Sequence, residues 1–107
     1  MTGKQLRYLA EVLLLAGLPL GAQTTGSLAG TAEDPSGSLL PGCLVKVTET
    51  GSGAERNVST GDHGRYLVPG LPPGLYRVEI SRSGFRSEKR EDIELPAGRT
   101  VRVDFRL

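Results

Sequence analysis

The sequence predicts a single all-β domain, built as a β-sandwich of about seven short strands. The chain of 107 residues is long enough for one domain at most. Its 15 glycines and 7 prolines imply many turns between short elements. Between these turns, apolar and polar residues alternate at period two, which is typical of half-buried strands. Strands that recur at spacings of about ten residues indicate a sandwich.

The N-terminal segment has the layout of a secretory signal peptide. It begins with two basic residues, continues with an apolar run from Val12 to Leu20, and ends in small residues before a cleavage site after Ala22. The apolar run is shorter than the ~20 residues that span a bilayer. We therefore expect a signal-peptide helix over residues 1–22 and an exported domain over residues 23–107; the alternative is an ordinary N-terminal helix.

The first two strands of the domain are predicted on either side of a turn-rich connection. The stretch "GSLAGTAED" alternates over residues 26–34, "DPSGSLLPG" supplies the connection, and "CLVKVTET" alternates over residues 43–50. The positions that share the inward face are Leu28, Gly30, Ala32, Cys43, Val45 and Val47.

The middle of the chain is predicted to hold a polar edge strand and two apolar strands. The stretch "ERNVST" is short and polar, as edge strands often are. In "VPGLPPGLYRVEI", prolines and glycines are predicted to form a corner that ends one strand and begins the next, because proline lacks an N–H group and glycine adopts backbone angles that other residues avoid. The corner consists of Pro69, Gly70, Pro72, Pro73 and Gly74. The inward positions on either side of it are Tyr66, Val68, Tyr76, Val78 and Ile80.

The C-terminal third begins with a charged segment and ends in a strand. The stretch "RSEKREDIEL" is predicted to run over the surface and to reach the core at Ile93 and Leu95. The last segment, "RTVRVDFRL", alternates up to the final residue. Its apolar face consists of Val101, Val103, Phe105 and Leu107.

The charge of the domain does not indicate a nucleic-acid or membrane-surface partner. Without residues 1–22, the chain holds 11 basic and 11 acidic side chains, so it lacks the single-sign field that such partners require. The basic residues between Ser81 and Asp92 are interleaved with acidic ones, which is typical of a solvated face. We expect no nucleic-acid partner.

No motif of the sequence predicts an active site or a metal site. His63 is the only histidine, and it stands in the turn "GDHG" without the HxH, HExxH or cysteine pairs that hold a metal ion. Cys43 is the only cysteine, and at an inward strand position it acts as a small hydrophobe; a disulfide between two chains is the alternative. We therefore expect no enzyme activity and no catalytic, cofactor-binding or metal-binding residues.

Two further features of the sequence bear on covalent modification, and neither is strong evidence for it. A lysine–asparagine isopeptide bond occurs in some secreted sandwiches, but here Lys46 alternates outward and Asn57 lies in the polar middle strand instead of the last one, so the sequence predicts no such bond. The stretch from Asn57 to Ser59 is a short glycosylation acceptor motif, which indicates mainly that this segment can be a polar surface.

Taken in order, the punctuated strands resemble the carboxypeptidase regulatory-like domain. The family pattern reads G-x-V-x-D-x-x-G, P-G-x-x-V-x-V, T-D-x-x-G-x-Y, L-P-x-G-x-Y-x-V and G-F, and it follows this chain from about Gly26 to Leu107. In "TGDHGRY", Gly61 stands where the family has an acidic residue, and Asp62 comes one place later. The resemblance implies a transthyretin-like (prealbumin-like) β-sandwich of about seven strands, related to the carbohydrate-binding-like fold.

The resemblance also implies a cellular setting. In bacteria such domains often form the N-terminal extension of TonB-dependent outer-membrane receptors, and a signal peptide followed at once by this domain is similar to that arrangement. We therefore expect a non-catalytic accessory domain of the bacterial envelope, exported to the periplasm, the outer membrane or the extracellular space. Its expected partners are other proteins or the remainder of a receptor, and the chain is either a stand-alone domain or a fragment.

The alternative function is a carbohydrate-binding module. Sugar rings are commonly held on flat aromatic side chains, but the sequence has no tryptophan, and Tyr66 and Tyr76 both fall on inward positions. A pocket of polar loop groups stays open as a carbohydrate site.

Overall fold

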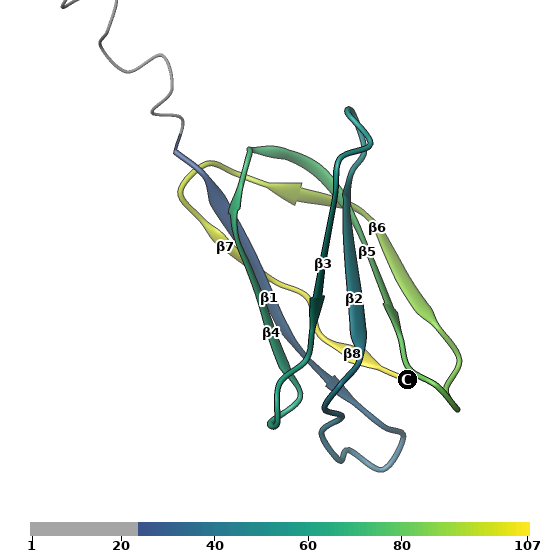
Figure 1. Ribbon diagram of the computed structural model, residues 1–107. Helices are drawn as coiled ribbons and strands as arrows, with labels where there is room; N and C mark the ends of the chain where they lie inside the picture. The colour runs from purple at the N-terminus through teal and green to yellow at the C-terminus, as the bar shows by residue number, and fades with distance from the viewer. Residues whose placement is uncertain (1–23) are drawn as a thin grey trace, which may run out of the picture.

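The computed structural model describes residues 24–107, which form a sandwich of two four-stranded sheets (Figure 1). The signal-peptide helix expected over residues 1–22 lies outside the described residues. The strands are β1 (Gly26–Glu33), β2 (Leu44–Glu49), β3 (Glu55–Ser59), β4 (Arg65–Leu71), β5 (Gly74–Ser81), β6 (Glu88–Leu95), β7 (Thr100–Arg102) and β8 (Phe105–Arg106). The predicted all-β sandwich is confirmed.

One sheet has the strand order β4-β1-β7, with β8 also paired to β1, and the other has the order β3-β2-β5-β6. Paired strands are antiparallel, except that β1 runs parallel to β7 and β8. The segment predicted as one last strand is divided in two, because Val103 and Asp104 stand between its two pairings with β1. This division gives eight strands where about seven were expected.

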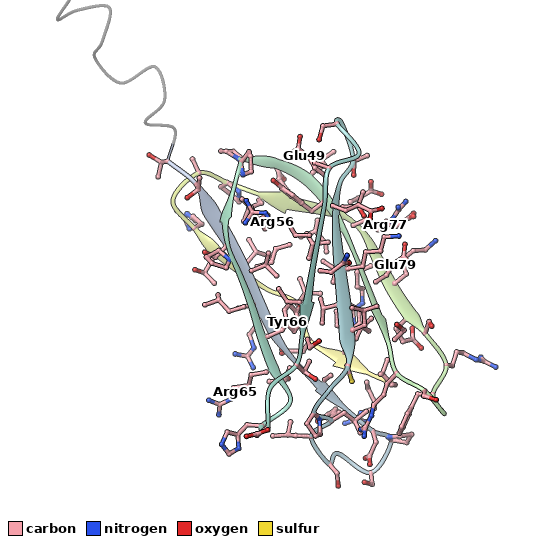
Figure 2. The ribbon with its side chains drawn as sticks, in the orientation of Figure 1. Glu49, Arg56, Arg65, Tyr66, Arg77 and Glu79 are labelled. Carbon is pink, nitrogen blue, oxygen red and sulfur yellow. The ribbon has the colours of Figure 1, made fainter. Side chains whose placement is uncertain are left out.

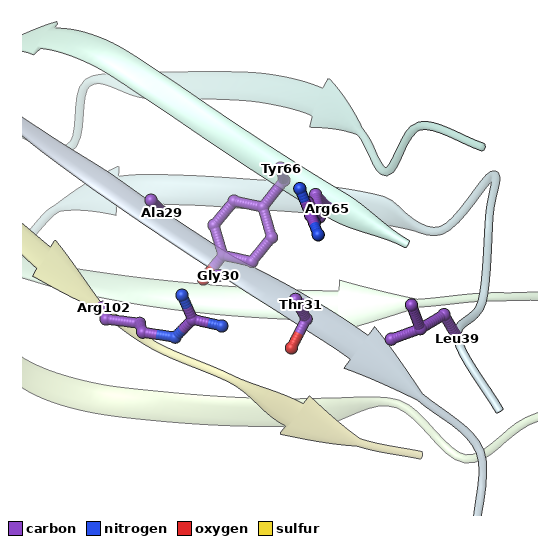
Figure 3. A pocket seen from close by; sticks show the side chains of 7 residues that line it. All are labelled: Ala29, Gly30, Thr31, Leu39, Arg65, Tyr66 and Arg102. Carbon is purple, nitrogen blue, oxygen red and sulfur yellow. The ribbon is translucent and has the colours of Figure 1, made fainter. Parts of the chain in front are cut away.

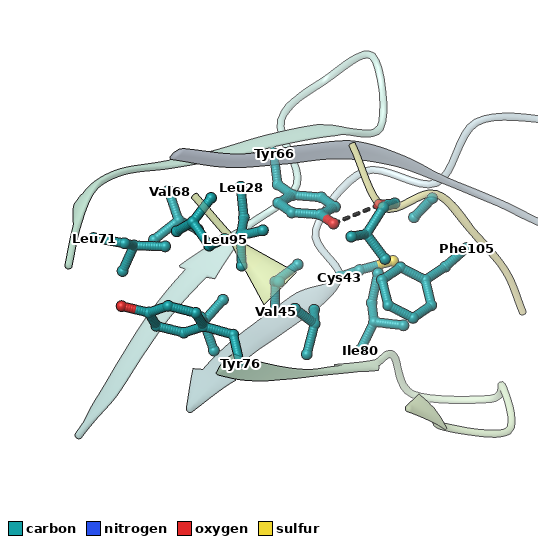
Figure 4. Close-up of a cluster of buried hydrophobic side chains, with 14 of the residues drawn as sticks. Leu28, Cys43, Val45, Tyr66, Val68, Leu71, Tyr76, Ile80, Leu95 and Phe105 are labelled. Carbon is teal, nitrogen blue, oxygen red and sulfur yellow. Dashed lines mark hydrogen bonds between the residues drawn. The ribbon is translucent and has the colours of Figure 1, made fainter. Parts of the chain in front are cut away.

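The alternation of the strands buries one face of each sheet in a shared core (Figure 4). The side chains predicted to face inward in β1, β4 and β5 and around β2 are at most 4% exposed. Leu95, Val103 and Phe105 complete this core from the C-terminal strands. Full burial of one such aliphatic or aromatic side chain contributes roughly 1.5–3 kcal/mol, so the predicted alternation identifies the contacts that hold the two sheets together.

β1 and the segment between β7 and β8 approach each other closely at Gly30. A Cβ atom on Gly30 would lie 1.9 Å from the carbonyl oxygen of Val103. The Tyr66 hydroxyl donates a hydrogen bond to the same oxygen, and the Val103 amide donates to the Ala29 carbonyl oxygen at 2.8 Å. Glycine is therefore required at this position for the C-terminal segment to lie against β1.

The predicted corner between β4 and β5 is smaller than expected. β4 continues through Pro69 and Gly70 to Leu71, so only Pro72 and Pro73 connect the two strands. The prediction that Pro69 ends the strand was wrong because β4 is an edge strand, where a residue without an N–H group loses no ladder hydrogen bond. Gly70 has a φ of +69°, at a bulge where the register with β1 shifts.

The charged segment that was predicted to run over the surface is an eight-residue edge strand, β6. Its first five residues are exposed, so no period of two is visible in that part of the sequence. The register with β5 shifts between Tyr76 and Val78, and Asp92 at this bulge has a φ of +55°, which is uncommon for a residue other than glycine.

An arginine joins the two sheets along each open side of the sandwich. On one side, Arg56 of β3 donates hydrogen bonds to the carbonyl oxygens of Pro69 at 2.6 Å and Gly70 at 3.0 Å in β4 (Figure 2). On the other side, Arg90 of β6 donates to the carbonyl oxygen of Asp104 at 3.2 Å. These bonds satisfy backbone groups outside the sheet ladders and link the edge strands of the two sheets.

Candidate functional site

The outer face of the sheet that contains β1 carries a shallow pocket of about 410 Å³ (Figure 3). The outward residues of the central strand are small, whereas their neighbours on both sides are long. Ala29 lies beside Leu67 of β4 and Arg102 of β7, and Thr31 lies beside Arg65 of β4. This difference in size produces the hollow. The residues that line the pocket are Ala29, Gly30, Thr31, Leu39, Arg65, Tyr66 and Arg102.

The carboxylate of Asp104 organises one wall of this pocket. It accepts hydrogen bonds from the Thr31 amide at 2.9 Å, from the Thr31 hydroxyl at 3.2 Å and from Arg102 Nε at 2.9 Å. Partial burial acts to raise the pKa of Asp104, but the bonds from Arg102 and Thr31 outweigh it and hold the pKa below its usual value. Asp104 is therefore ionised at neutral pH and neutralises Arg102.

Arg65 gives the opposite wall its charge. The side chain belongs to an exposed residue at the start of β4, and no acidic side chain lies within ion-pair distance of it in residues 24–107. Two large apolar side chains beside it are exposed as well, Leu39 at 45% and Leu67 at 57%. The pocket thus combines a free cationic group with apolar surface, a combination that suits an anionic ligand with an apolar face.

Tyr66 also lines the pocket, but its side chain is buried in the core. Burial raises the pKa of its hydroxyl far above the usual value, and the negative charge of Asp104 raises it further. The hydroxyl stays protonated and donates to Val103. The inward position predicted for Tyr66 is confirmed, and the ring offers no exposed stacking platform for a sugar.

A second, smaller pocket of about 170 Å³ lies where the ends of β2, β3 and β4 meet. The Tyr76 hydroxyl donates to the Pro72 carbonyl oxygen and lies 3.2 Å from Glu49 Oε2. Burial, together with the hydrogen bond to Glu49 and the charge of that carboxylate, raises the pKa of Tyr76 to about 12. Arg56, which also lines this pocket, is bound to the β4 carbonyl groups. The polar groups here hold the sandwich closed and form no nucleophile–base pair.

The residues weighed as candidates in the sequence are dispersed in the structure. His63 lies in an exposed turn between β3 and β4, as expected. Cys43 is fully buried, and its thiol donates to the Leu40 carbonyl oxygen at 3.6 Å. The described part of the chain has no group of three or more histidine, cysteine or acidic residues that could hold a metal ion.

The outer face of the second sheet differs from the pocket face because its basic side chains are held in ion pairs. Lys46 lies opposite Asn57 in the β2–β3 ladder and forms an ion pair with Glu55 at 3.3 Å. Two further ion pairs on β5 and β6 are Arg77–Glu79 at 3.2 Å and Lys89–Glu91 at 3.5 Å. This face is a solvated, self-neutralised surface, as the mixed charges of β6 predicted.

The sequence did not reveal the pocket on the outer face. The small outward residues of β1 are visible in the sequence, but their long neighbours become known only once the register of β4, β1 and β7 is known. Residues 24–107 contain no helix that is long and apolar enough to cross a membrane.

Comparison with protein families gives a match over nearly the whole described region. The model of the carboxypeptidase regulatory-like domain matches residues 27–107. The chain belongs to this family. The resemblance stated from the strand pattern is therefore confirmed, and with it the sandwich that the family implies.

The chain is also similar in sequence to a transporter protein. The chain is 34% identical over 101 residues to the TonB-dependent transporter Oar of Myxococcus xanthus. The match covers 90% of this chain and 9% of the relative, so the chain spans about a tenth of that protein's length. The matched part of that relative thus belongs to a protein described as a TonB-dependent transporter.

Solved structures with the same fold come from several kinds of protein. A dioxygenase domain from a dioxygenase carbohydrate-binding protein fusion of Streptomyces sp. SirexAA-E has a TM-score of 0.63 at 14% identity, with 83% of this chain and 82% of that chain covered. A putative carbohydrate-binding protein from Bacteroides uniformis has a TM-score of 0.61 at 21% identity, with 76% and 40% covered. The Bacillus anthracis TIE protein has a TM-score of 0.63 at 24% identity, with 78% and 16% covered. At these identities, the likenesses show a shared fold alone. The family of this chain comes from the separate match to the carboxypeptidase regulatory-like domain.

Proposed function

We propose that this chain is the exported, non-catalytic N-terminal domain of a TonB-dependent-transporter-like protein of the bacterial outer membrane. The observation that carries the proposal is the 34% identity to the Oar transporter over 90% of the chain. Because the matched region is 9% of that relative, we infer that the domain acts as an appendage to a longer envelope protein. Its partners are the remainder of that protein or other envelope proteins.

The state of the tyrosine hydroxyl groups supports a non-catalytic role. Both Tyr66 and Tyr76 donate to backbone carbonyl oxygens inside the fold. Their pKa values are raised, so neither hydroxyl ionises readily at neutral pH. A nucleophile or general base needs a pKa near the working pH and a free path to substrate.

Export is tested by N-terminal sequencing of the protein from fractionated bacterial cells. We expect the mature chain to begin at Gln23 and to be recovered with the envelope, together with transporter sequence encoded by the same gene. A chain that keeps residues 1–22 and stays in the cytoplasm would contradict export. A gene without plug or barrel sequence would contradict the transporter setting.

A second candidate function is carbohydrate binding at the outer-face pocket. The observation in its favour is Arg65, whose charge has no acidic partner among the described residues and stands beside apolar surface. A carboxylate-bearing sugar would pair with this guanidinium and pack against Leu39.

A glycan array that includes uronic-acid polysaccharides tests this candidate. We expect the unchanged chain to bind an acidic glycan, Arg65→Ala to lose the binding, and Arg77→Ala to keep it, because Arg77 lies on the paired face of the other sheet. If the unchanged chain binds none of the glycans, the domain is not a lectin for the sugars presented.

A further inference from the structure

The first strand and the last strands of the domain lie side by side and run in the same direction. β1 pairs with β7 at residues 27–29 and with β8 at Ala32 and Glu33. The chain therefore enters this ladder at one end of the sandwich and leaves it at the opposite end (Figure 1). In an antiparallel pair of terminal strands, the two chain ends would leave from the same end.

The interval between β7 and β8 does not interrupt the connection to β1. The Val103 amide donates to the Ala29 carbonyl oxygen at 2.8 Å, and the Asp104 carboxylate accepts the Thr31 amide at 2.9 Å. Further on, the Leu107 amide donates to the Glu33 carbonyl oxygen at 2.8 Å. Backbone groups are thus bonded across this contact along the whole length of β1.

Other elements prevent β1 from sliding past the C-terminal strands. On its second side β1 is held by the antiparallel ladder with β4. The Tyr66 hydroxyl of β4 reaches across to the Val103 carbonyl oxygen. Arg106 of β8 and Glu33 of β1 form an ion pair at 2.7 Å at the C-terminal end.

We propose that the domain is a load-bearing link that resists tension between its two ends. Tension on both ends pulls β1 and the β7–β8 segment in opposite directions along their axes, so their hydrogen bonds are loaded together in shear. A ladder that is pulled from one end opens one bond at a time. This inference rests on the proposed function, in which the transporter continues after Leu107. Because the mature chain would begin at Gln23, three residues before β1, the load on the other end comes from an envelope protein bound to the N-terminal end of the domain.

Single-molecule force spectroscopy on the full 107-residue chain tests the inference by comparing two pulling axes. Handles at the N- and C-termini load the ladder in shear. A second molecule carries its handles at the N-terminus and at Ala97→Cys, an exposed position next to Gly98, whose amide bonds to the Thr25 carbonyl oxygen at 3.1 Å. On this axis the force peels β1 from β7 from one end. Cys43 is buried, so the unchanged chain serves as the labelling control.

We expect the unfolding force along the terminal axis to be about twofold higher or more than along the peeling axis, because forced unfolding follows the unfolding barrier on the path that is loaded. Equal forces on the two axes would overturn the inference. That result would leave the transporter proposal standing, because cell fractionation and the sequence of the gene test it separately.

Variants of Asp104 test whether its carboxylate contributes to the resistance. Asp104→Ala removes the acceptor for the Thr31 amide, and we expect it to lower the force on the terminal axis and not on the peeling axis. Asp104→Asn keeps an acceptor oxygen and should restore most of the force. Glu91→Ala, which removes an exposed ion pair with Lys89 outside the ladder, should change neither. An equal drop on both axes for Asp104→Ala would assign Asp104 to general stability and contradict its role in the link.

Discussion

Gly30 is the position at which one added carbon atom has the largest effect on this fold. The atoms that a Cβ would meet belong to the backbone of Val103, which cannot rotate away as the end of a flexible side chain can. The alternation of the sequence placed Gly30 on the inward face, but not against Val103. That contact joins residues from opposite ends of the domain, and no local pattern records it.

Gly30→Ala is expected to destabilise the domain by about 1–3 kcal/mol or to prevent folding, because the C-terminal segment must move away from β1. Chemical denaturation measures the loss. Gly51→Ala is the matched control, since its Cβ would meet no atom within 4 Å and its φ is not in the left-handed region. Equal stability of the two variants would contradict the steric argument.

Tyr76 links pH to stability. Its pKa is raised from 10.0 to about 12 in the folded state, so between these values the folded chain binds the proton more tightly than the unfolded chain. The stabilisation is present below pH 10 and is lost as the pH rises toward 12. We expect Tyr76→Phe to reduce this alkaline loss of stability, measured by denaturation at several pH values.

At neutral pH, Tyr76→Phe should lower the free energy of unfolding by about 0.5–1.5 kcal/mol, because the hydrogen bond to Pro72 is lost.

At the scale of elements, the strands with one buried face and the polar edge strand β3 were predicted correctly, whereas the extents of the edge strands β4 and β6 were not. The inward residues of β2 and β5 fall at every second position, since both strands lie in the middle of their sheet, and only Thr48 of β2, predicted to face outward, is buried as well, at 8% exposed. β4 and β6 lie at edges and contain bulges, where proline, glycine and charged residues are tolerated. Their sequences therefore contain the signals that elsewhere mark a loop.

The bulge of β6 gives a test at Asp92. Its φ of +55° strains a β-branched side chain but suits glycine. We expect Asp92→Val to lower the free energy of unfolding by about 1–2 kcal/mol, and Asp92→Gly to leave it unchanged or to raise it. The contrary order of the two variants in thermal denaturation would show that the bulge is not formed.

The contact between β3 and β4 depends on the fork of Arg56. One guanidinium binds two successive carbonyl groups at 2.6 and 3.0 Å, which a lysine ammonium cannot reproduce with the same geometry. Arg56→Lys is therefore expected to lower the free energy of unfolding by about 1 kcal/mol and to speed amide hydrogen exchange in β4. Arg77→Lys, on the outer face of the other sheet, is the control and should leave β4 exchange unchanged.

At the scale of the whole molecule, the sequence was sufficient to predict a sandwich of two sheets, the approximate number of its strands and the family. It was not sufficient for the pocket beside Arg65, because that site combines side chains from β1, β4 and β7 whose relative register is set by tertiary contacts. Candidate residues that stand alone in the sequence, such as His63, also stand apart in the structure.

The edges of the two sheets lead to an expectation about assembly. β3 is short and polar, and its Arg56 is bonded to β4. β4 carries Pro69 and a bulge, β6 carries charges and a bulge at Asp92, and β7 and β8 are short. These features oppose strand addition from a second molecule. We expect the domain of residues 23–107 to be monomeric by light scattering, and a dimer that is lost on mutation of an edge strand would contradict this.

The parallel pairing of β1 with the last strands also limits how this domain can be rearranged by protein engineering. The eight residues of β1 extend about 25 Å at ~3.3 Å each, so a linker that rejoined the two ends would need roughly eight residues or more, laid across the sandwich. Circular permutation with a short linker should fail, and so should insertion of the domain into a tight surface loop of a host protein. End-to-end fusion needs no such span. Repeated copies would form a linear string, each adding its own length to the distance between the parts it separates.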